Sequence, residues 1–349
     1  MDLQKLREFT ANGSITKPPN DIETHFLRGW SFNTLLGYNA AIKKFNKCMI
    51  SRGISHFELP LSANDIKYFC FWAGRIADAP SDHDFAAKTL VKYVSGLKAW
   101  HLFHKKPYPR EADERVAILL RSSGKADAMA ARKPKKAAVR LHHLVFLAES
   151  LIRQSPREQA VLDLALVAFV GMARLAEVTY ENETGKLSKS LKILTTDVEE
   201  VSASLTKITL RSAKTCKAGE TQTIKLRTLP NALCPAKAIR RRLAEAGPNA
   251  TSLFGYFERG ERCHITRPVA VSVLSKTWST GGFKELSGHS FRVGGASLRM
   301  ALGVDVKEIC SLGRWKSECY KLYIRPYSPS EREETLELFA ALQKSWEQT

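Results

Sequence analysis

The segment GHSFRVGGAS, residues 288–297, places a histidine and an arginine three positions apart at the polar start of a stretch that then turns apolar. In a helix, His289 and Arg292 would project from the same face, because side chains at positions i and i+3 are neighbours on a helical surface. The spacing alone does not show whether the two residues are ordinary surface side chains of a helix or part of an active site. Composition and motifs elsewhere in the sequence distinguish these two interpretations.

The composition predicts a globular protein of two domains that binds a polyanion. The chain has 349 residues, more than one typical domain core, and 44% of them are hydrophobic. Lys and Arg number 54 against 35 Asp and Glu, which gives a formal net charge of +19. Such a surplus is typical of proteins that make many phosphate contacts, so nucleic acid is the leading partner. A basic surface that binds nothing is the alternative.

The sequence contains no signal for a membrane or a metal. No apolar run approaches the roughly 20 residues of a membrane span, and the first residues lack the apolar core of a signal peptide. The seven cysteines are scattered, without a C-x-x-C pair or a zinc-like spacing. We therefore expect a soluble intracellular protein with reduced thiols, no structural metal and no cofactor. The basic run ARKPKK predicts nuclear localisation in a eukaryotic host, and otherwise a cytoplasmic or nucleoid protein.

Hydrophobic periodicity predicts a helical N-terminal domain. Residues 1–30 are polar, lack periodicity and include Pro18 and Pro19, so a flexible arm is expected there. Residues 31–124 contain four segments in which apolar residues recur every three or four positions, which predicts a helical DNA-binding bundle. Lysines on its remaining faces would suit a phosphate backbone, although solvated surface lysines are the simpler interpretation. These are Lys43, Lys44, Lys47, Lys88, Lys92 and Lys98.

Residues 125–140, KADAMAARKPKKAAVR, predict a linker between two domains. The stretch is basic, rich in alanine and interrupted by Pro134, and it has nothing to bury. Its positive charge would let it follow a DNA backbone. The candidate contacts are Arg132, Lys133, Lys135 and Lys136.

Residues 141–349 predict a second domain of helices with one β-hairpin, so the whole fold is expected to be mainly α with a small β component. Residues 155–179 read as one helix that is apolar nearly all round and therefore central to a core. KITLRSAK and TQTIKLRTL flank the turn-rich TCKAGE, which predicts a hairpin with a basic tip. Further helices are expected over 141–154, 234–247, 271–278, 289–303, 304–315 and 331–348.

Charged and aromatic residues interrupt the apolar segments of this second domain. Arg174 lies in GMARLAEV, straight after the most apolar part of this helix, where a buried charge would be costly without a partner, and Glu177 lies one turn away as a natural ion-pair partner. Lys214 lies at the predicted hairpin tip. Trp315 and Tyr323 follow in LGRWKSECYKLYIRPY. Each residue alone is ordinary, but the order Arg, hairpin Lys, H-x-x-R, Trp, Tyr is not.

This order resembles that of the tyrosine recombinases, also called the phage integrase family. GMARLAEV resembles the family's first arginine box, RSAKT resembles its hairpin lysine, and SGHSFRVGGAS is very like the Cre segment of that family. GRWKSECYKLYIR looks most like the recombinases of eukaryotic mobile elements, the Crypton and DIRS-like groups. The resemblance covers residues 31–345. It implies a core-binding helical domain followed by an α+β catalytic domain over 141–349.

The resemblance also implies a reaction, site-specific cutting and rejoining of DNA through a 3′-phosphotyrosyl intermediate, without metal or ATP. Arg174 and Arg292 would stabilise the charge of the pentacoordinate phosphate, and Trp315 would contact that phosphate. Tyr323 would be the nucleophile, and His289 would assist removal of its proton.

Lys214 would protonate the departing 5′-oxygen and Glu177 would orient Arg174. The chain would assemble on double-stranded DNA as a homodimer or tetramer, with its C-terminal helix docked on a neighbouring protomer.

Several alternatives stay open at this stage. Tyr320 and Tyr327 rival Tyr323, because the interval from Trp315 to Tyr323 is about one residue shorter than in the Cre segment. Lys217 is a possible substitute for Lys214. A type IB topoisomerase or resolvase-like enzyme would share the covalent chemistry. A DNA-binding protein descended from a recombinase, without cleavage activity, is the alternative from another class.

Overall fold

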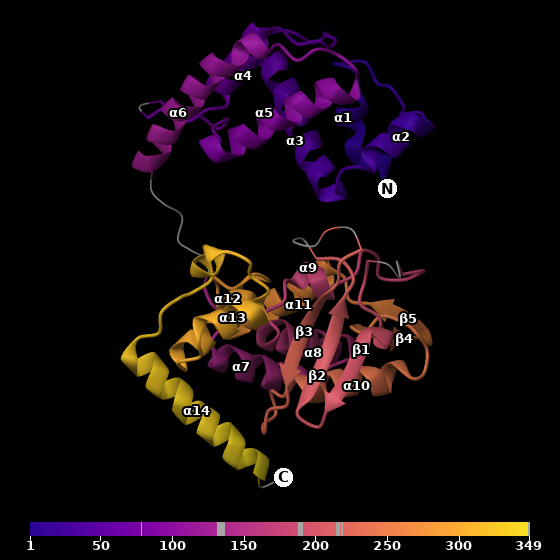
Figure 1. Ribbon diagram of the computed structural model, residues 1–349, viewed down its shortest axis with the longest axis vertical. Helices are drawn as coiled ribbons and strands as arrows, with labels where there is room; N and C mark the ends of the chain where they lie inside the picture. Colours follow the sequence, from indigo (N-terminus) through magenta and orange to yellow (C-terminus); the bar gives the residue numbers. More distant parts are fainter. Residues whose placement is uncertain (78, 131–136, 188–190, 214–216, 218, 348–349) are drawn as a thin grey trace. The chain divides into compact units, whose positions relative to one another are not determined.

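In the computed structural model the chain forms two compact units, residues 1–133 and 134–349 (Figure 1). The structure describes all residues except 78, 131–136, 188–190, 214–216, 218 and 348–349. The division between the units falls within the stretch predicted as a linker, although helix α6 (Asp113–Met129) reaches into that stretch. Among the described helices, none is long and apolar enough to cross a membrane. The predicted linker contacts Arg132, Lys133, Lys135 and Lys136 lie outside the described residues.

The first unit is built around the four helices that the periodicity predicts. α3 (Phe32–Ser51) packs along α5 (Ala87–Phe103), while α4 (Ala63–Trp72) contacts α6. α4 begins after Ser62, whose side chain caps the helix by accepting a hydrogen bond from the backbone N–H of Asp65. Aromatic rings fill the centre, with Phe45 in edge contact with both Phe69 and Trp100.

The N-terminal residues belong to this core, which corrects the expectation of a flexible arm over residues 1–30. They form the short helices η1 (Leu3–Leu6), α1 (Arg7–Thr10) and α2 (Asp21–Leu27). Leu6 and Phe9 are fully buried among the same side chains as Trp100, whose indole N–H donates to the carbonyl of Ala11 over 2.8 Å. Segments of four residues are too short to show a periodic pattern, so only their burial reveals them.

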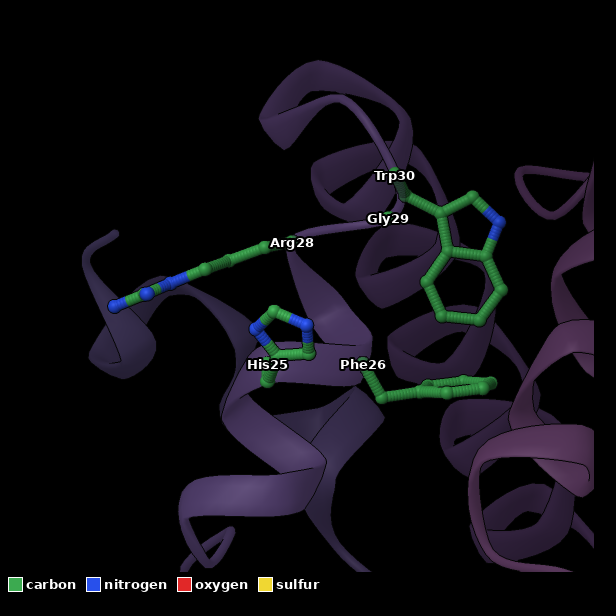
Figure 2. A pocket seen from close by; sticks show the side chains of 5 residues that line it. All are labelled: His25, Phe26, Arg28, Gly29 and Trp30. Carbon is green, nitrogen blue, oxygen red and sulfur yellow. The ribbon is translucent and has the colours of Figure 1, made fainter.

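A shallow hollow lies at the end of α2, lined by His25, Phe26, Arg28, Gly29 and Trp30 (Figure 2). The rings of Phe26 and Trp30 meet edge to face, with centroids 5.2 Å apart. Trp30 also contacts Phe9 at 6.1 Å and the first turns of α3. The aromatic wall of the hollow therefore ties α2 to the N-terminal helix and to α3.

The second unit surrounds α8 (Pro156–Val170), as its uniformly apolar sequence predicts. Every residue from Ala160 to Phe169 is buried. The elements packed on α8 are α7 (Leu141–Leu151), α10 (Pro235–Ala246), α11 (Arg267–Thr280), α12 (Ser290–Ala301) and β4 (Gly255–Glu258).

A three-stranded antiparallel sheet contains the predicted hairpin. β2 (Leu205–Leu210) pairs with β3 (Gln222–Arg227), and β1 (Val198–Ser202) adds to the other edge of β2 (Figure 1). A second hairpin joins β4 to β5 (Glu261–His264). The sequence did not predict β1, β4 or β5, because β1 is short and largely exposed and the other two strands have four residues each.

The chain ends with three elements that follow α12. They are α13 (Val306–Gly313), the 3₁₀ turn η4 (Glu318–Leu322) and α14 (Pro329–Glu347). α14 packs on α7 of its own chain through Leu338, Phe339 and Leu342, and Glu331 pairs with Arg140 at 3.1 Å. In this structure the helix that was expected to dock on a neighbour is accommodated within its own unit.

Replacing Phe9 with alanine should destabilise the first unit by about 3–5 kcal/mol, because a fully buried aromatic ring is lost and a cavity remains. Phe71→Ala is the matched control, since Phe71 belongs to the same unit and is 54% exposed. Calorimetric melting of the full chain measures both variants. Equal effects of the two substitutions would restore the flexible-arm interpretation.

Candidate active site

The site begins where α8 ends. The sequence predicted one helix over 155–179, but α8 stops at Gly171, Met172 adopts a left-handed φ of 45°, and α9 (Leu175–Val178) starts afresh. Gly171 has no room for a side chain, since a Cβ there would lie 2.5 Å from a methyl carbon of Ile224 on β3. Arg174 is the N-cap of α9 and has extended backbone. The helix break thus places the arginine in the turn between two helices.

Three arginines meet the carbonyl groups at the C-terminus of α8. Arg299 donates to the carbonyl of Val170 over 2.7 Å, Arg314 donates to that of Gly171 over 3.2 Å, and Arg292 donates to that of Met172. The last carbonyls of a helix have no partner within the helix, and they carry the negative end of its dipole. A helix terminus of this kind can hold cations in a buried position.

Glu177 joins two of the site's arginines through one buried carboxylate. Its Oε1 accepts from Arg174 Nη1, as the sequence predicted, and its Oε2 accepts from Arg314 Nη2 over 2.7 Å. The side chains of Glu177 and Arg314 are only 5% and 7% exposed, whereas that of Arg174 is 23% exposed. Of the two arginines, Arg174 has the more accessible guanidinium.

Close backbone packing of α12 brings the H-x-x-R segment into the core. A Cβ at Gly294 would lie 2.1 Å from the carbonyl oxygen of Val139, and one at Gly295 would lie 2.2 Å from that of Phe169. Only glycine permits this approach. Gly295 therefore lets α12 lie against α8, Gly294 lets it lie against the segment before α7, and together they carry Arg292 into the interior.

Arg292 is fully buried and faces two aromatic rings. Its guanidinium carbon lies 4.4 Å from the ring centroid of Trp315 and 5.3 Å from that of Tyr323. Besides Met172, it donates to the carbonyl of Gly313 over 2.5 Å. Burial, together with the positive charges of Arg174 and Arg314, lowers the pKa of Arg292 to about 10, so it is still a cation at neutral pH.

Two buried N–H groups beside these rings have no acceptor in the described part of the chain. They are Nε of Arg292 and the indole Nε1 of Trp315. A buried donor without a partner is destabilising, so both groups favour an added acceptor such as an anionic oxygen. A phosphate oxygen has the charge and the lone pairs that such donors require.

His289 and Tyr323 complete the cluster. The ring centroid of Tyr323 lies 5.1 Å from that of His289 and 5.0 Å from that of Trp315. Burial lowers the pKa of His289, and the charges of Arg292, Arg174 and Arg325 lower it further. The imidazole is therefore neutral at physiological pH, which is the form that can accept a proton.

Ser297 of α12 holds the segment that carries Tyr323. Its hydroxyl accepts from the N–H of Arg325 over 2.8 Å and donates to the carbonyl of Val293 over 2.7 Å, with the carbonyl of Tyr323 a longer second acceptor at 3.3 Å. The rival tyrosines have different surroundings. The ring of Tyr327 lies under the guanidinium of Arg140, 3.7 Å from ring centroid to carbon, and Tyr320 packs against the cluster that contains Trp315, as Tyr323 also does. Tyr323 alone contacts both His289 and Trp315 among the described tyrosines.

The structure thus brings together Arg174, Glu177, His289, Arg292, Trp315 and Tyr323, and sequence reasoning missed Arg314, Ser297 and Arg325. Lys214 lies outside the described residues, while its alternative Lys217 is exposed in the hairpin loop. The only sequence signal for Arg314 was its position next to Trp315. Among the described residues, no group of three or more His, Cys, Asp or Glu side chains could hold a metal ion.

The predicted DNA-contacting lysines of the first unit differ in their surroundings. Lys43, Lys47, Lys88 and Lys92 are exposed, as a phosphate contact requires. Lys98 is exposed too but pairs with Asp113 at 3.0 Å. The ammonium of Lys44 lies over the rings of Trp72 and Phe85, 4.9 and 4.5 Å from their centroids, and so contributes to packing.

No family model matches this sequence, and comparison with curated proteins also finds no match. Solved structures do match. The XerH site-specific recombinase bound to its difH substrate is 13% identical, with a TM-score of 0.53 over 89% of this chain and 81% of that one. The Tn1549 transposon integrase in complex with circular intermediate DNA is 13% identical, with a TM-score of 0.51 over 91% of this chain and 98% of that one. The chain therefore has the fold of the tyrosine recombinases, as the resemblance implied.

The imidazole of His289 should titrate below its ordinary pKa of 6.5, because burial and three neighbouring guanidinium groups disfavour its charged form. Arg174→Gln removes one of these charges and should move the midpoint upward, whereas Arg332→Ala, at an exposed position of α14, should leave it unchanged. NMR titration of the histidine ring protons measures this midpoint. A midpoint at or above 6.5 in the native protein would contradict the description of the site.

The same shift couples stability to pH. The unfolded chain protonates this histidine at a higher pH than the folded chain does, so the contribution of His289 to the free energy of unfolding is present above pH 6.5 and is lost as the pH falls through the lowered folded pKa. Denaturant unfolding of the native protein and of His289→Gln across this range isolates its contribution from those of the other buried histidines.

Proposed function

We propose that this protein is a site-specific DNA recombinase or integrase that cuts and rejoins double-stranded DNA through a covalent bond between Tyr323 and a 3′-phosphate. The observation that carries the proposal is the position of the Tyr323 ring, which contacts a neutral histidine, a tryptophan and a buried arginine at once. A phenol in these surroundings has a proton acceptor and a phosphate-binding cation within reach. The two matched structures were both determined with DNA bound, which supports a DNA substrate.

The guanidinium groups of Arg174 and Arg292 bind the non-bridging oxygens of the scissile phosphate. Their charge is fixed before the substrate arrives, so the extra negative charge of the pentacoordinate transition state meets donors that need no reorganisation. Trp315 adds its indole N–H, which has no acceptor among the residues that the structure describes. Glu177 holds Arg174 in the turn between α8 and α9.

The phenolic oxygen of Tyr323 attacks the phosphorus, and His289 accepts the phenolic proton. As the new O–P bond forms, the bond from phosphorus to the 5′-oxygen breaks, and that oxygen leaves as a hydroxyl after taking a proton from a lysine of the β2–β3 hairpin, Lys214 or its alternative Lys217. A 5′-hydroxyl of a second strand then attacks the phosphotyrosine. This step restores the phenol and joins the two strands.

We also propose that the protein works as an oligomer on DNA and, in a eukaryotic host, in the nucleus. Strand exchange joins two duplexes, so more than one active site has to act on the assembled substrate. The exposed lysines of the first unit would add contacts to the phosphate backbone.

Tyr323→Phe should eliminate covalent capture of DNA while leaving DNA binding intact, because only the nucleophilic oxygen is removed. The substrate is a library of nicked duplexes with random sequence, in which the nick releases the short 5′-hydroxyl strand and traps the adduct. Denaturing gels of protease-sensitive adducts measure capture, and gel shifts measure binding. Tyr327→Phe is the matched control and should still capture DNA.

Adduct formation by Tyr323→Phe would transfer the nucleophile to Tyr320 or Tyr327. Tight binding by the native protein without any adduct would instead support a binding protein that does not cleave. Relaxation of supercoiled DNA without joined products would support a topoisomerase.

A further inference from the structure

Arg314 occupies a backbone conformation that favours glycine. It ends α13 with φ 58° and ψ 39°, in the left-handed region, and its N–H donates to the carbonyl of Ser311 over 3.1 Å. A residue with a Cβ is destabilised in this region relative to glycine, which is why glycine is the commonest residue just beyond a helix C-terminus. The guanidinium of Arg314 must therefore contribute something that glycine could not.

The side chain of Arg314 connects two separate parts of the site. From the end of α13, next to Trp315, it reaches the carbonyl of Gly171 at the end of α8 and the carboxylate of Glu177 on α9. It is 7% exposed, so this contact is not an ordinary surface ion pair. Arg314 thus links the segment that carries Trp315 to the turn that carries Arg174.

Glu177 has two oxygens, and each pairs with a different arginine side chain. Arg314 Nη2 bonds Oε2, which also accepts from the backbone N–H of Arg174 over 3.0 Å, while Arg174 Nη1 bonds Oε1. Arginine and a carboxylate prefer a bidentate pair in which the guanidinium fork uses both oxygens. Arg314 is the side-chain donor on Oε2 and, together with the backbone N–H of Arg174, restricts the guanidinium of Arg174 to one oxygen of this carboxylate.

The net charge of Glu177, Arg174 and Arg314 also indicates a role for Arg314 in the function of Arg174. One carboxylate beside one arginine would be neutral, but Glu177 lies between two arginines, so this trio keeps one positive charge. Because Glu177 is buried, its charge acts strongly on its neighbours. A second arginine therefore preserves the positive potential that Arg174 presents to an anion.

We propose that Arg314 is a positioning residue for DNA cleavage, which acts by occupying one oxygen of Glu177 so that Arg174 keeps its free donors and its positive charge for the scissile phosphate. This inference rests on the proposed function. It assigns to Arg314 no contact with the substrate. Its effect on the reaction passes through Glu177.

The test uses five variants of the full chain, namely Arg314→Gly, Arg314→Lys, Glu177→Gln, the double variant of Arg314→Gly with Glu177→Gln, and the control Arg259→Gly. Arg259 also has a left-handed φ, 49°, but is exposed in the β4–β5 turn, so its replacement relieves the same backbone conformation away from the site. The nicked duplex captured by the native protein is the substrate. Single-turnover adduct formation, DNA affinity and the melting midpoint are measured for each variant.

Arg314→Gly should lower the rate of adduct formation by about tenfold to a hundredfold, the scale of a small misplacement of a catalytic group, with DNA affinity little changed. Its melting midpoint should fall, because the carbonyl of Gly171 and one oxygen of the buried Glu177 lose their partner and the better backbone fit of glycine offsets only part of this loss, so rates are compared well below the midpoint of every variant. Arg314→Lys should recover part of the rate, because it restores the charge, and Arg259→Gly should have the native rate. In the Glu177→Gln background, Arg314→Gly should cause little further loss, since the carboxylate through which it acts is absent.

A native rate for Arg314→Gly, or a loss that multiplies fully with that of Glu177→Gln, would overturn the inference while leaving the recombinase proposal intact. Failure of the native protein to form an adduct with any duplex of the library would overturn the proposed function and the role of Arg314 with it. Adduct formation by the native protein distinguishes the two failures, because it is present in the first case and absent in the second.

Discussion

The unpaired carbonyl groups at the C-terminus of α8 are the constraint around which the second unit is organised. The carbonyls of Val170, Gly171 and Met172 each accept a hydrogen bond from a different arginine. These oxygens would otherwise be left unpaired in a buried environment, and the negative end of the helix dipole adds to their attraction for cations. The helix end thus stabilises a buried positive charge, a group that is costly to remove from water without partners.

This arrangement explains why the candidate catalytic residues lie so close to helix ends. Arg292 takes its acceptors from Met172, just past α8, and from Gly313, the last residue of α13. Arg174 follows Met172 by two positions, and Trp315 follows Gly313 by two positions. Each of the two turns that present a carbonyl to Arg292 therefore also carries a site residue. The turn after α8 carries Arg174, and the turn after α13 carries Trp315. Because α12 meets α8 through glycine, the fixed distance between the two backbones sets the position of the guanidinium.

Much of this architecture could be predicted from sequence, because it depends on patterns of burial. The apolar run of α8 and the periodicity of α3 to α6 are direct consequences of packing. The break after α8 could not be predicted in the same way, since Met172, Ala173 and Arg174 suit a helix by propensity, and Gly171 ends it through a contact with β3. Phe9 was missed because its helix has only four residues. Arg314 was missed because an arginine between a glycine and a tryptophan gives no sign of a left-handed backbone.

The charge of the assembled site suits the chemistry of a phosphodiester. Arg174, Arg292 and Arg314 place three guanidinium groups around the single carboxylate of Glu177, so the cluster has an excess of two positive charges. A phosphodiester has one negative charge in the ground state and gains a second as it becomes pentacoordinate. In the proposed reaction, a rigid excess of two charges would favour the transition state over the bound substrate, which is the condition for catalysis. Burial and the same positive charges lower the pKa of His289 and keep its imidazole neutral, which is the state that the proposed transfer of a proton from Tyr323 requires.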